Sequence, residues 1–418
     1  MKKIAIIGFG SRGQMFARII KQQNNAELVA IAEPGENSRK KASIEFGVPE
    51  STCYASADEF FAQGKICDAI FLCTQDRQHY KMAITALELG YDICLEKPAA
   101  ATLEECVAIR DTAIKLGRKV MLTHVMRYAP FYRHIKSLID DGALGDIVTI
   151  NQTENIAYWH FALSYVRGPW KKMEDSTPTI IAKCCHDLDL ILWLMNKKCK
   201  SVSSFGSLYH FRSDKAPKGS AEHCADCDES VREKCLYNAY KIYPERMKHG
   251  VVGGTARLIG KDIVEVIDKR EDAIAKCVYH SENNAIDNQV VNICFEDDST
   301  AHLTMTAFSQ ECYRYLKVHG TQGEVYGNAD EGILYYTRYG QPQQKIDVNE
   351  AFNKLGVQLS GGHGGGDTYL YMDFIDYITN DSPSVTRTTI EKSIVSHMLG
   401  FKAEESRLQG GKVLKIED

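Results

Sequence analysis

The chain has 418 residues, of which 44% are hydrophobic and 25% charged, with a formal net charge of −5. This length exceeds one ordinary domain and suits two, and the composition is typical of a soluble globular protein. The charge balance argues against nucleic acid or an anionic membrane as the main partner. The apolar run at residues 4–7 is too short for a signal peptide, and no window of about 18 apolar residues follows, so we expect a cytoplasmic protein.

The first third of the chain has the pattern of a dinucleotide-binding unit. Residues 3–8 (KIAIIG) form a short apolar run, typical of a buried parallel strand, and GFGSRG at 8–13 has the G-x-G-x-x-G spacing. A helical stretch comes next, and a second predicted strand ends in Glu33, where a carboxylate can bind both hydroxyls of a ribose. The alternative is a glycine turn in an α/β domain without a ligand. Because Glu33 would repel a 2′-phosphate, NAD is favoured over NADP, although Arg39 and Lys40 lie close by in sequence.

Polar residues follow the later strands of this predicted sheet. Strands are expected over 67–74, 91–98 and 119–128, and ligands of doubly wound sheets bind beyond the carboxyl ends of the strands. The residues at or just past those ends are Thr74, Gln75, Glu96, Lys97, His124 and Arg127.

The stretch KCCHDLDL at 183–190 lies in a predicted helix over 177–196, with Thr177 as N-cap and Pro178 in the first turn. Adjacent thiols diverge by about 100° on a helix, which argues against a metal ion there. A proton relay fits better, because imidazole titrates near neutral pH and His186 shares a face with Lys183. Asp189 could orient the His186 ring. The alternative is a core histidine with satisfied hydrogen bonds.

Two further segments carry candidate substrate ligands. Residues 155–170 are rich in aromatic and hydrogen-bonding side chains, which suit sugars, although a packed loop under the sheet is the alternative. A glycine loop at 361–366 carries His363, which could reach a ligand or lie on a plain surface loop. The candidate substrate-binding residues are Arg127, Tyr158, His160, Tyr165, Arg167, Trp170, Asp189 and His363.

A cysteine-rich insertion is expected at about 212–280. Cys224, Cys227 and Cys235 have the spacing of metal ligands, and Cys277 is a plausible fourth. Four thiolates would hold a structural zinc ion, because such a closed site has no open position for catalysis. The alternative is a set of isolated, reduced thiols.

Taken together, these motifs resemble the Gfo/Idh/MocA family of oxidoreductases. The resemblance rests on GFGSRG, the Thr74–Gln75 turn with His79, EKP at 96–98, the segment 124–147 and CHDLDLILWL at 185–194. It implies an α/β fold: an NAD-binding Rossmann domain over 1–123 with a doubly wound parallel sheet, and a substrate-binding domain over 124–418 with a large, mostly antiparallel open sheet. That sheet often mediates oligomers, so a homodimer or homotetramer is expected. The implied cofactor-binding residues are Gly8, Phe9, Gly10, Ser11, Arg12, Gly13, Glu33, Thr74, Gln75, His79, Glu96 and Lys97.

The resemblance also implies an activity. Typical members oxidise or reduce a hydroxyl of a sugar or cyclitol with NAD(P), with the EKP lysine, here Lys97, and the second-signature histidine, here His186, handling the proton. One position departs from the pattern: family dehydrogenases commonly carry an aspartate four residues before this histidine, and here Ala182 stands there with Lys183 beside it. Lys183 is therefore a candidate replacement, as a substrate ligand or a second cation.

The leading hypothesis is an NAD-dependent dehydrogenase acting on a sugar or cyclitol, or on its glycoside. The second is a glycoside-cleaving enzyme in which tightly bound NAD oxidises the substrate transiently and the acidified C–H then permits elimination. The third is a non-enzymatic NAD-binding regulator on the same fold. The pairing of Lys97 with His186 argues against the third.

Overall fold

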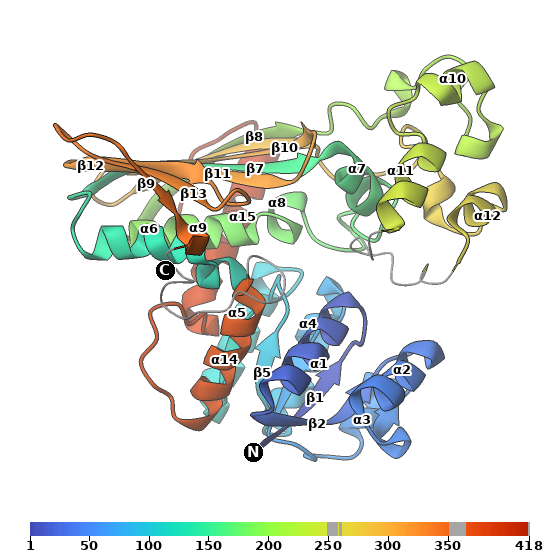
Figure 1. Cartoon of the computed structure of the whole chain (residues 1–418), viewed down its shortest axis with the longest axis horizontal. Helices are drawn as coiled ribbons and strands as arrows, with labels where there is room; N and C mark the ends of the chain where they lie inside the picture. The colour runs from blue at the N-terminus through green and yellow to red at the C-terminus, as the bar shows by residue number, and fades with distance from the viewer. Residues whose placement is uncertain (249–257, 259–260, 351–364, 417–418) are drawn as a thin grey trace.

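The computed structural model describes residues 1–248, 258, 261–350 and 365–416, which form two sheets with their helices (Figure 1). The first sheet has six parallel strands in the order β3-β2-β1-β4-β5-β6, as a Rossmann-type unit requires. Its strands are β1 (Lys2–Ile7), β2 (Ala26–Ala32), β3 (Cys53–Tyr54), β4 (Ala69–Leu72), β5 (Asp92–Leu95) and β6 (Val120–Leu122). Its helices are α1 (Ser11–Gln23), α2 (Glu36–Phe46), α3 (Ala57–Phe61), α4 (Asp76–Glu88) and α5 (Leu103–Leu116).

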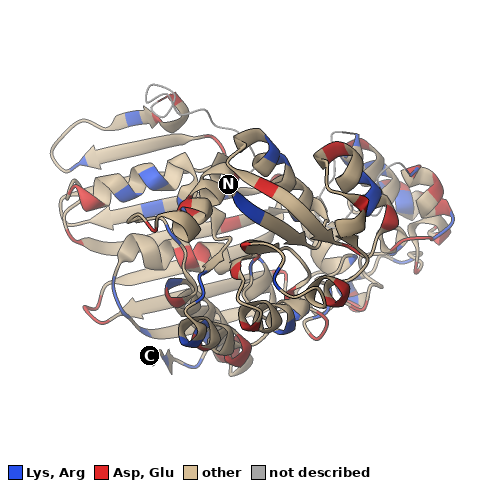
Figure 2. Cartoon of the chain, turned by 90° about the horizontal axis from the view of Figure 1, so that it is seen from below, with Lys and Arg blue, Asp and Glu red and all other residues tan. Residues whose placement is uncertain are grey.

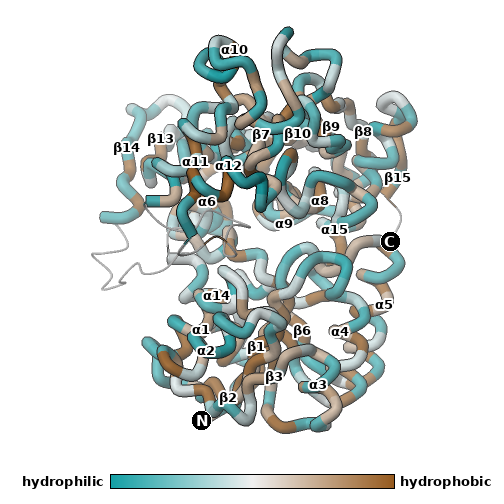
Figure 3. Tube along the Cα trace, turned by 90° about the vertical axis from the view of Figure 1, so that its right-hand side faces the viewer, coloured by the Kyte–Doolittle hydropathy of each residue, from teal (hydrophilic) through white to brown (hydrophobic). Residues whose placement is uncertain are grey.

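Most residues of these strands are apolar because helices cover both faces of the sheet, and the charged residues stand at or near the strand starts. All four residues of β4 are buried, and hydrophobic segments lie inside the unit along β1 and β6 (Figure 3). The last predicted strand, 119–128, is too long: β6 ends at Leu122, and Val125–Tyr128 form a 3-10 turn. That turn carries Arg127 toward the second unit.

The second sheet has nine strands in the order β14-β13-β12-β11-β7-β10-β9-β8-β15. Every neighbouring pair is antiparallel except β10 with β7, so the predicted fold class is confirmed. The strands are β7 (Ile147–Ala157), β8 (Cys199–Ser207), β9 (Asn288–Phe295), β10 (Thr300–Ser309), β11 (Tyr313–Gly320), β12 (Gly323–Asn328), β13 (Ile333–Arg338), β14 (Gln344–Asp347) and β15 (Leu414–Lys415).

Helices cover the face of this sheet that looks toward the first unit (Figure 1). They are α6 (Pro130–Asp140), α8 (Thr179–Ala182), α9 (Cys185–Met195) and α15 (Ile390–Leu408). The short α7 (Tyr158–Phe161) follows β7 and continues into a π-helical turn at Ala162–Val166. Residues 158–166 therefore lie at the end of the nine-stranded sheet, next to α11 (Figure 1).

The C-terminal part of the chain returns to the first unit. Helix α14 (Gly366–Thr379) packs on its sheet, where Phe374 and Tyr371 contact the ring of Phe71 on β4. The backbone after α14 also joins β6, since Leu122 donates to the carbonyl of Thr388. The first core is therefore completed by residues far beyond position 123.

The predicted insertion extends from one end of the nine-stranded sheet (Figure 1). It contains α10 (Glu229–Lys234), α11 (Ala239–Met247) and α12 (Ile263–Asp268), and α10 is mostly hydrophilic (Figure 3). Residues of α11 and α12 share a small hydrophobic cluster with Leu163 and Cys224. The insertion thus has a modest core of its own.

Acidic and basic residues are interspersed along both units (Figure 2). Within the described ranges, no helix is long and apolar enough to cross a membrane.

Candidate functional site

The glycine loop after β1 is shaped by contacts that exclude side chains. Gly8 has φ of +88°, and a Cβ there would lie 2.6 Å from the carbonyl oxygen of Cys73. A Cβ on Gly13 would lie 2.2 Å from the Gly8 oxygen, whereas one on Gly10 would meet nothing within 4 Å. The loop is therefore closely packed at Gly8 and Gly13 and open at Gly10. The open side lies at the N-terminus of α1, where a pyrophosphate can approach backbone amides.

Glu33, just after β2, presents a fixed carboxylate beside this loop. Its oxygens accept hydrogen bonds from the backbone amides of Phe9 (2.8 Å) and Gly35 (3.0 Å). The Arg39 guanidinium donates to the carbonyls of Glu33 and Pro34, and Lys40 pairs with Glu36 on the surface. The carboxylate is thus held where it can accept from ribose hydroxyls, with one guanidinium close by.

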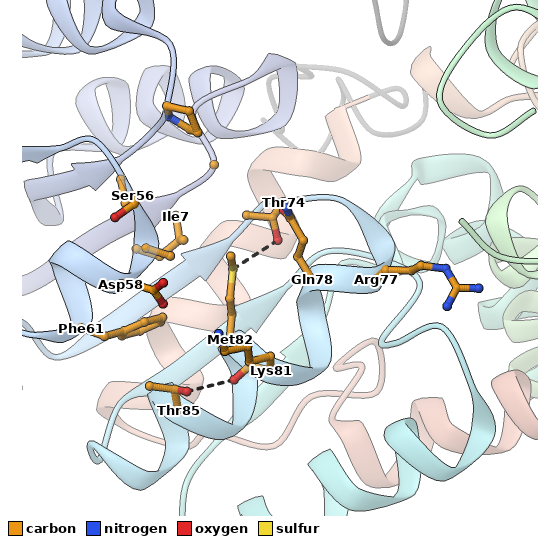
Figure 4. Close-up of a pocket in the computed structure, with 14 residues that line it drawn as sticks. Ile7, Ser56, Asp58, Phe61, Thr74, Arg77, Gln78, Lys81, Met82 and Thr85 are labelled. Atoms are coloured by element: carbon orange, nitrogen blue, oxygen red, sulfur yellow. Dashed lines mark hydrogen bonds between the residues drawn. The ribbon is translucent and has the colours of Figure 1, made fainter. Parts of the chain in front are cut away.

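A cavity of about 410 Å³ opens beside these residues at the carboxyl ends of β1, β2 and β4 (Figure 4). Its size and position suit the adenosine end of a dinucleotide. Sequence reasoning identified Gly8 and Thr74 in its wall but missed the side chains contributed by α3 and α4. The residues at α3 could have been predicted, because they follow the carboxyl end of the short strand β3, where ligands of such sheets bind. The missed lining residues are Ser56, Asp58, Phe61, Arg77, Gln78, Lys81, Met82 and Thr85.

Several predicted cofactor residues hold the loops together with their side chains. The ring nitrogens of His79 lie 2.7 Å from the Pro98 oxygen and 3.1 Å from the Thr74 oxygen, so this ring links two strand-end loops. Gln75 caps α4.

The Glu96 carboxylate is a second link between loops. It accepts from Arg12 and from the Thr123 hydroxyl, while Arg12 also pairs with Asp367 on α14. The Arg12 and Glu96 side chains are therefore bound to protein groups rather than open toward a ligand.

The prediction of one continuous helix over 177–196 is wrong. Helix α8 ends at Ala182, Lys183 and Cys184 interrupt the helix, and α9 begins at Cys185. Lys97, after β5, donates from Nζ to the Ala182 carbonyl oxygen at 2.7 Å, which satisfies a backbone acceptor at the interruption. The interruption therefore joins the EKP motif to the segment that carries His186.

Thr177 is also not the predicted N-cap, because Pro178 occupies that position. The Thr177 hydroxyl instead donates to Asp76 at the start of α4, and the indole of Trp170 donates to the same carboxylate oxygen. Asp76 thereby ties the first unit to the candidate substrate segment.

Lys183 lies in a buried ionic network. Its Nζ is 3.0 Å from Oε1 of Glu154 on β7, and Arg314 on β11 pairs with both Glu154 and Asp187. Burial alone would lower the pKa of Lys183, but Glu154 outweighs it and holds the pKa above its ordinary value. Sequence reasoning missed Glu154 and Arg314, although Gln152 and Glu154 stand at alternate positions of β7, between the apolar Ile150 and Ile156 of the same buried face.

His160 on α7 lies near both lysines. Its burial, together with the positive charges of Lys183 and Lys97, lowers the pKa of His160 to about 3. The imidazole is therefore neutral at physiological pH and offers one donor and one acceptor. Lys97, Lys183 and His160 form a group of polar side chains contributed by three separate segments.

His186 is buried at the start of α9, with its ring centroid 5.8 Å from that of His124. The prediction that Asp189 orients His186 differs from the observed pairing, in which Asp189 binds Arg127 through two hydrogen bonds of 2.6 Å. Nδ1 of His124 lies 3.0 Å from the same carboxylate. Burial would lower the pKa of His124, but Asp189 outweighs it and raises the pKa to about 9. Arg127 and Asp189 thus form a buried pair behind His186 rather than open substrate ligands.

The aromatic candidates divide between the site and the insertion. Tyr165 is buried and stacks between Phe161 and Trp170, and Tyr158 packs edge-on against Tyr237.

Arg167 faces the insertion. Its guanidinium donates to the carbonyls of Lys276 and Tyr237 and to the Tyr243 hydroxyl, so it is saturated by protein groups. We therefore do not retain Arg167 as a substrate ligand. His363 lies outside the described residues.

The four predicted zinc ligands, Cys224, Cys227, Cys235 and Cys277, line one small cavity in the insertion. Within the part of the chain that the structure describes, no three His, Cys, Asp or Glu side chains are already arranged to hold a metal ion. Neither zinc nor another metal is established by this geometry.

Comparison with known proteins agrees with this architecture. Residues 2–124 match the family model described as "Oxidoreductase family, NAD-binding Rossmann fold", and residues 136–396 match "Oxidoreductase family, C-terminal alpha/beta domain". The putative oxidoreductase YteT of Bacillus subtilis is 25% identical over 391 residues, which cover 89% of this chain and 88% of that protein. A 2,7-anhydro-N-acetylneuraminate hydratase of Mediterraneibacter gnavus is 26% identical over 204 residues, which cover 48% of this chain and 51% of the hydratase.

Among solved structures, an inositol dehydrogenase homolog from Azotobacter vinelandii, complexed with NAD+, has the same fold. The TM-score is 0.71 at 16% identity, covering 99% of this chain and 97% of that one. The glycine loop, the cavity beside Glu33 and both matched domain models lead to one assignment. The chain belongs to the Gfo/Idh/MocA family of oxidoreductases, whose first domain is an NAD-binding Rossmann fold.

Proposed function

We propose that this chain is an NAD-dependent oxidoreductase that transfers a hydride between a hydroxyl-bearing carbon of a sugar or cyclitol and the nicotinamide ring. The observation that carries the proposal is the contact between Lys97 Nζ and the Ala182 carbonyl. It joins the carboxyl end of a Rossmann strand to the start of the helix that carries His186. Hydroxyl oxidation needs both a hydride acceptor and a proton acceptor. This junction supplies protein groups that can accept the proton.

The lysine and histidine would divide the proton chemistry. An ammonium group has three N–H donors, and the Ala182 carbonyl uses one of them, so Lys97 keeps donors for a substrate oxygen. As the hydroxyl loses its proton, that charge-assisted hydrogen bond strengthens and stabilises the alkoxide. His186 would take the proton as general base. When bound, NAD accepts the hydride from the same carbon.

The neighbouring groups suit a polyhydroxylated substrate. Lys183 stays charged beside Glu154 and replaces the carboxylate that relatives commonly carry near this position. Neutral His160 can donate to one hydroxyl and accept from another. Trp170 and Tyr165 provide an aromatic wall held by Asp76. Convergent polar groups beside aromatic rings are typical of carbohydrate sites.

NAD is the preferred cofactor in this proposal. The Glu33 carboxylate is fixed by two amides, so it would meet a 2′-phosphate at close range without room to turn away. Arg39 donates to the backbone carbonyls of Glu33 and Pro34, so part of its hydrogen-bonding capacity is already used by protein groups.

A homodimer or homotetramer would form through the uncovered face of the nine-stranded sheet. Phe205, Val290 and Tyr315 lie in one cross-strand row across β8 to β11 and are 58%, 39% and 38% exposed. Light scattering coupled to size exclusion tests this. Substituting Val290 and Tyr315 with glutamate should shift an oligomer to monomers, and an unchanged mass would contradict it.

A second candidate is glycoside cleavage through transient oxidation and elimination. A relative named as a hydratase of a sugar acid favours it, because a hydratase reaction has no net redox change. The two functions share Lys97 and His186 but differ in what happens to the reduced cofactor.

One experiment separates these functions. Absorbance of reduced nicotinamide is followed with added NAD against sugars, inositols, uronic acids and glycosides, and purified protein is assayed for retained NAD. Net reduction of added NAD by one class supports the dehydrogenase. Retained NAD with release of an aglycone, and no net absorbance change, supports the second candidate. Cofactor binding with no turnover of any class would favour a regulator.

A further inference from the structure

Four cysteines distributed along the insertion line a single small cavity. Cys224 begins a 3-10 turn (Cys224–Asp226), Cys227 follows it, Cys235 follows α10, and Cys277 comes about forty residues later in the sequence. The cavity measures about 20 Å³, which is room for one small guest. We propose that these four thiolates form a structural zinc site.

Backbone contacts bring the distant segments together. The amide of Cys277 donates to the Glu222 carbonyl at 2.8 Å, and His223 pairs with Lys276 in an antiparallel bridge. Cys277 is thereby placed against the Cys224–Cys227 turn, although the helices α11 and α12 separate them in sequence. The amide of Ala221 donates to the Cys227 sulfur at 3.3 Å. Such amide donors orient and stabilise a metal-bound thiolate.

The charge around the cavity also favours thiolates. Four thiolates and one Zn²⁺ carry a net charge of −2, which is costly to bury without a cation. Arg167 is buried with Nη2 at 3.7 Å from the Cys224 sulfur, and Arg232 also lines the cavity. Arg167 is therefore better explained as a structural residue than as a substrate ligand. It would compensate the negative charge of the zinc site, and it anchors the insertion through the carbonyls of Lys276 and Tyr237.

Closure of the site would accompany metal binding. Among the described residues, no three of the candidate side chains are positioned to bind one metal ion. On binding zinc, the four sulfurs would therefore move together until each lies about 2.3 Å from the ion. Four protein ligands leave no open position, so the ion acts on stability and not on the reaction. Because Arg167 directly follows the π-helical turn that ends at Val166, an ordered insertion also steadies residues 158–170.

The test measures metal content and needs no turnover, so it stands whether or not the proposed reaction is right. The full-length protein is expressed in zinc-supplemented medium, purified without chelator and analysed for zinc and iron by mass spectrometry. We expect one zinc per chain. Cys235→Ser and Cys277→Ser should lose most of it, while Cys294→Ser on β9, which lies outside the cluster, should retain it.

A second measurement guards against variants that fail to fold. Chelated wild-type protein is titrated with Co²⁺, and a thiolate-to-metal charge-transfer band should saturate at one equivalent. Chelation should also lower the midpoint of thermal unfolding, and zinc should restore it. Folded wild-type protein with neither zinc nor cobalt binding would overturn the proposal, as would iron with inorganic sulfide in place of zinc.

Discussion

The proposed cofactor half and the proposed substrate half of this site would recognise their ligands by different means. In the proposed cofactor half, the candidate ligand contacts are backbone amides and one carboxylate, and they come from short motifs that directly follow strands, such as Gly8–Gly13 and Glu33. In the substrate half, charged side chains from distant segments meet, as Glu154 on β7, Lys183 and Arg314 on β11 do. The first half depends on the shape of the backbone, and the second on buried ionic pairs.

That difference predicts different responses to substitution. Changing the cofactor half should alter ligand binding or local packing, whereas breaking a buried pair in the substrate half should destabilise the whole fold.

The largest expected effect is on the buried pair behind His186. Asp189→Asn removes the carboxylate that binds Arg127 and leaves a guanidinium buried without its counter-ion. We expect a loss of about 3–5 kcal/mol in the free energy of unfolding, measured by urea denaturation. Asp214→Asn, which breaks an exposed pair with Arg212, is the control and should leave the free energy of unfolding close to that of the wild type, because solvent screens this pair. Equal losses in the two variants would contradict this comparison.

The next effect is a pH dependence. The folded pKa of His124, about 9, lies above the ordinary value of 6.5, so the interaction with Asp189 stabilises the fold fully below pH 6.5. That stabilisation is lost as pH rises through 9. Relative to His124→Gln, the wild type should lose on the order of 3 kcal/mol between pH 6 and pH 10. Burial alone would raise the pKa of Asp189, but Arg127 and His124 lower it, so the pKa shifts of His124 and Asp189 arise from the same interaction. A stability difference that stays constant with pH would rule it out.

A pair of glycine substitutions should separate packing from binding. Gly13→Ala would place a Cβ 2.2 Å from the Gly8 oxygen, so it should destabilise the protein without ligand by about 1–3 kcal/mol. Gly10→Ala meets nothing within 4 Å, so its unfolding midpoint should match the wild type while NAD binding weakens. Thermal unfolding and fluorescence titration check both. Unchanged NAD affinity in Gly10→Ala would show that this loop does not bind NAD.

The smallest effect concerns cofactor choice. Glu33→Gln removes the charge that repels a 2′-phosphate and keeps one oxygen, which can accept from the amide of Phe9 or of Gly35 but not in place of both carboxylate oxygens. The ratio of NADP to NAD affinity should rise roughly tenfold, about 1.4 kcal/mol. Glu36→Gln, which alters only an exposed pair with Lys40, should leave the ratio as it is. If both variants behave alike, Glu33 does not select the cofactor.

The same contrast explains what the sequence could predict. Helix 103–116 and strand 288–295 have the bounds expected from their patterns, and the glycine loop and Glu33 lie where strand-end spacing puts them. Such features depend on local periodicity and on the topology of parallel sheets.

The features that were missed depend on tertiary pairing. The apolar pattern of 177–196 runs through Lys183 and Cys184 without a break, so only the contact from Lys97 reveals the interruption of the helix. From the sequence, Arg167 resembles a substrate ligand, because the residues next to it in the chain do not reveal whether its guanidinium is open to a ligand or bound by protein groups. The partners of Arg167 come from residues 237, 243 and 276.

The family resemblance implies both a cofactor contact and a catalytic role for Lys97, and we propose that its main role is in the reaction. The most direct test compares Lys97→Met with Lys115→Met, an exposed lysine on α5, in NAD titrations and in turnover of the substrate class found by screening. We predict that Lys97→Met binds NAD within a few-fold of wild type but loses roughly 100-fold or more in kcat, while Lys115→Met matches wild type in both. Undiminished turnover by Lys97→Met would contradict the account.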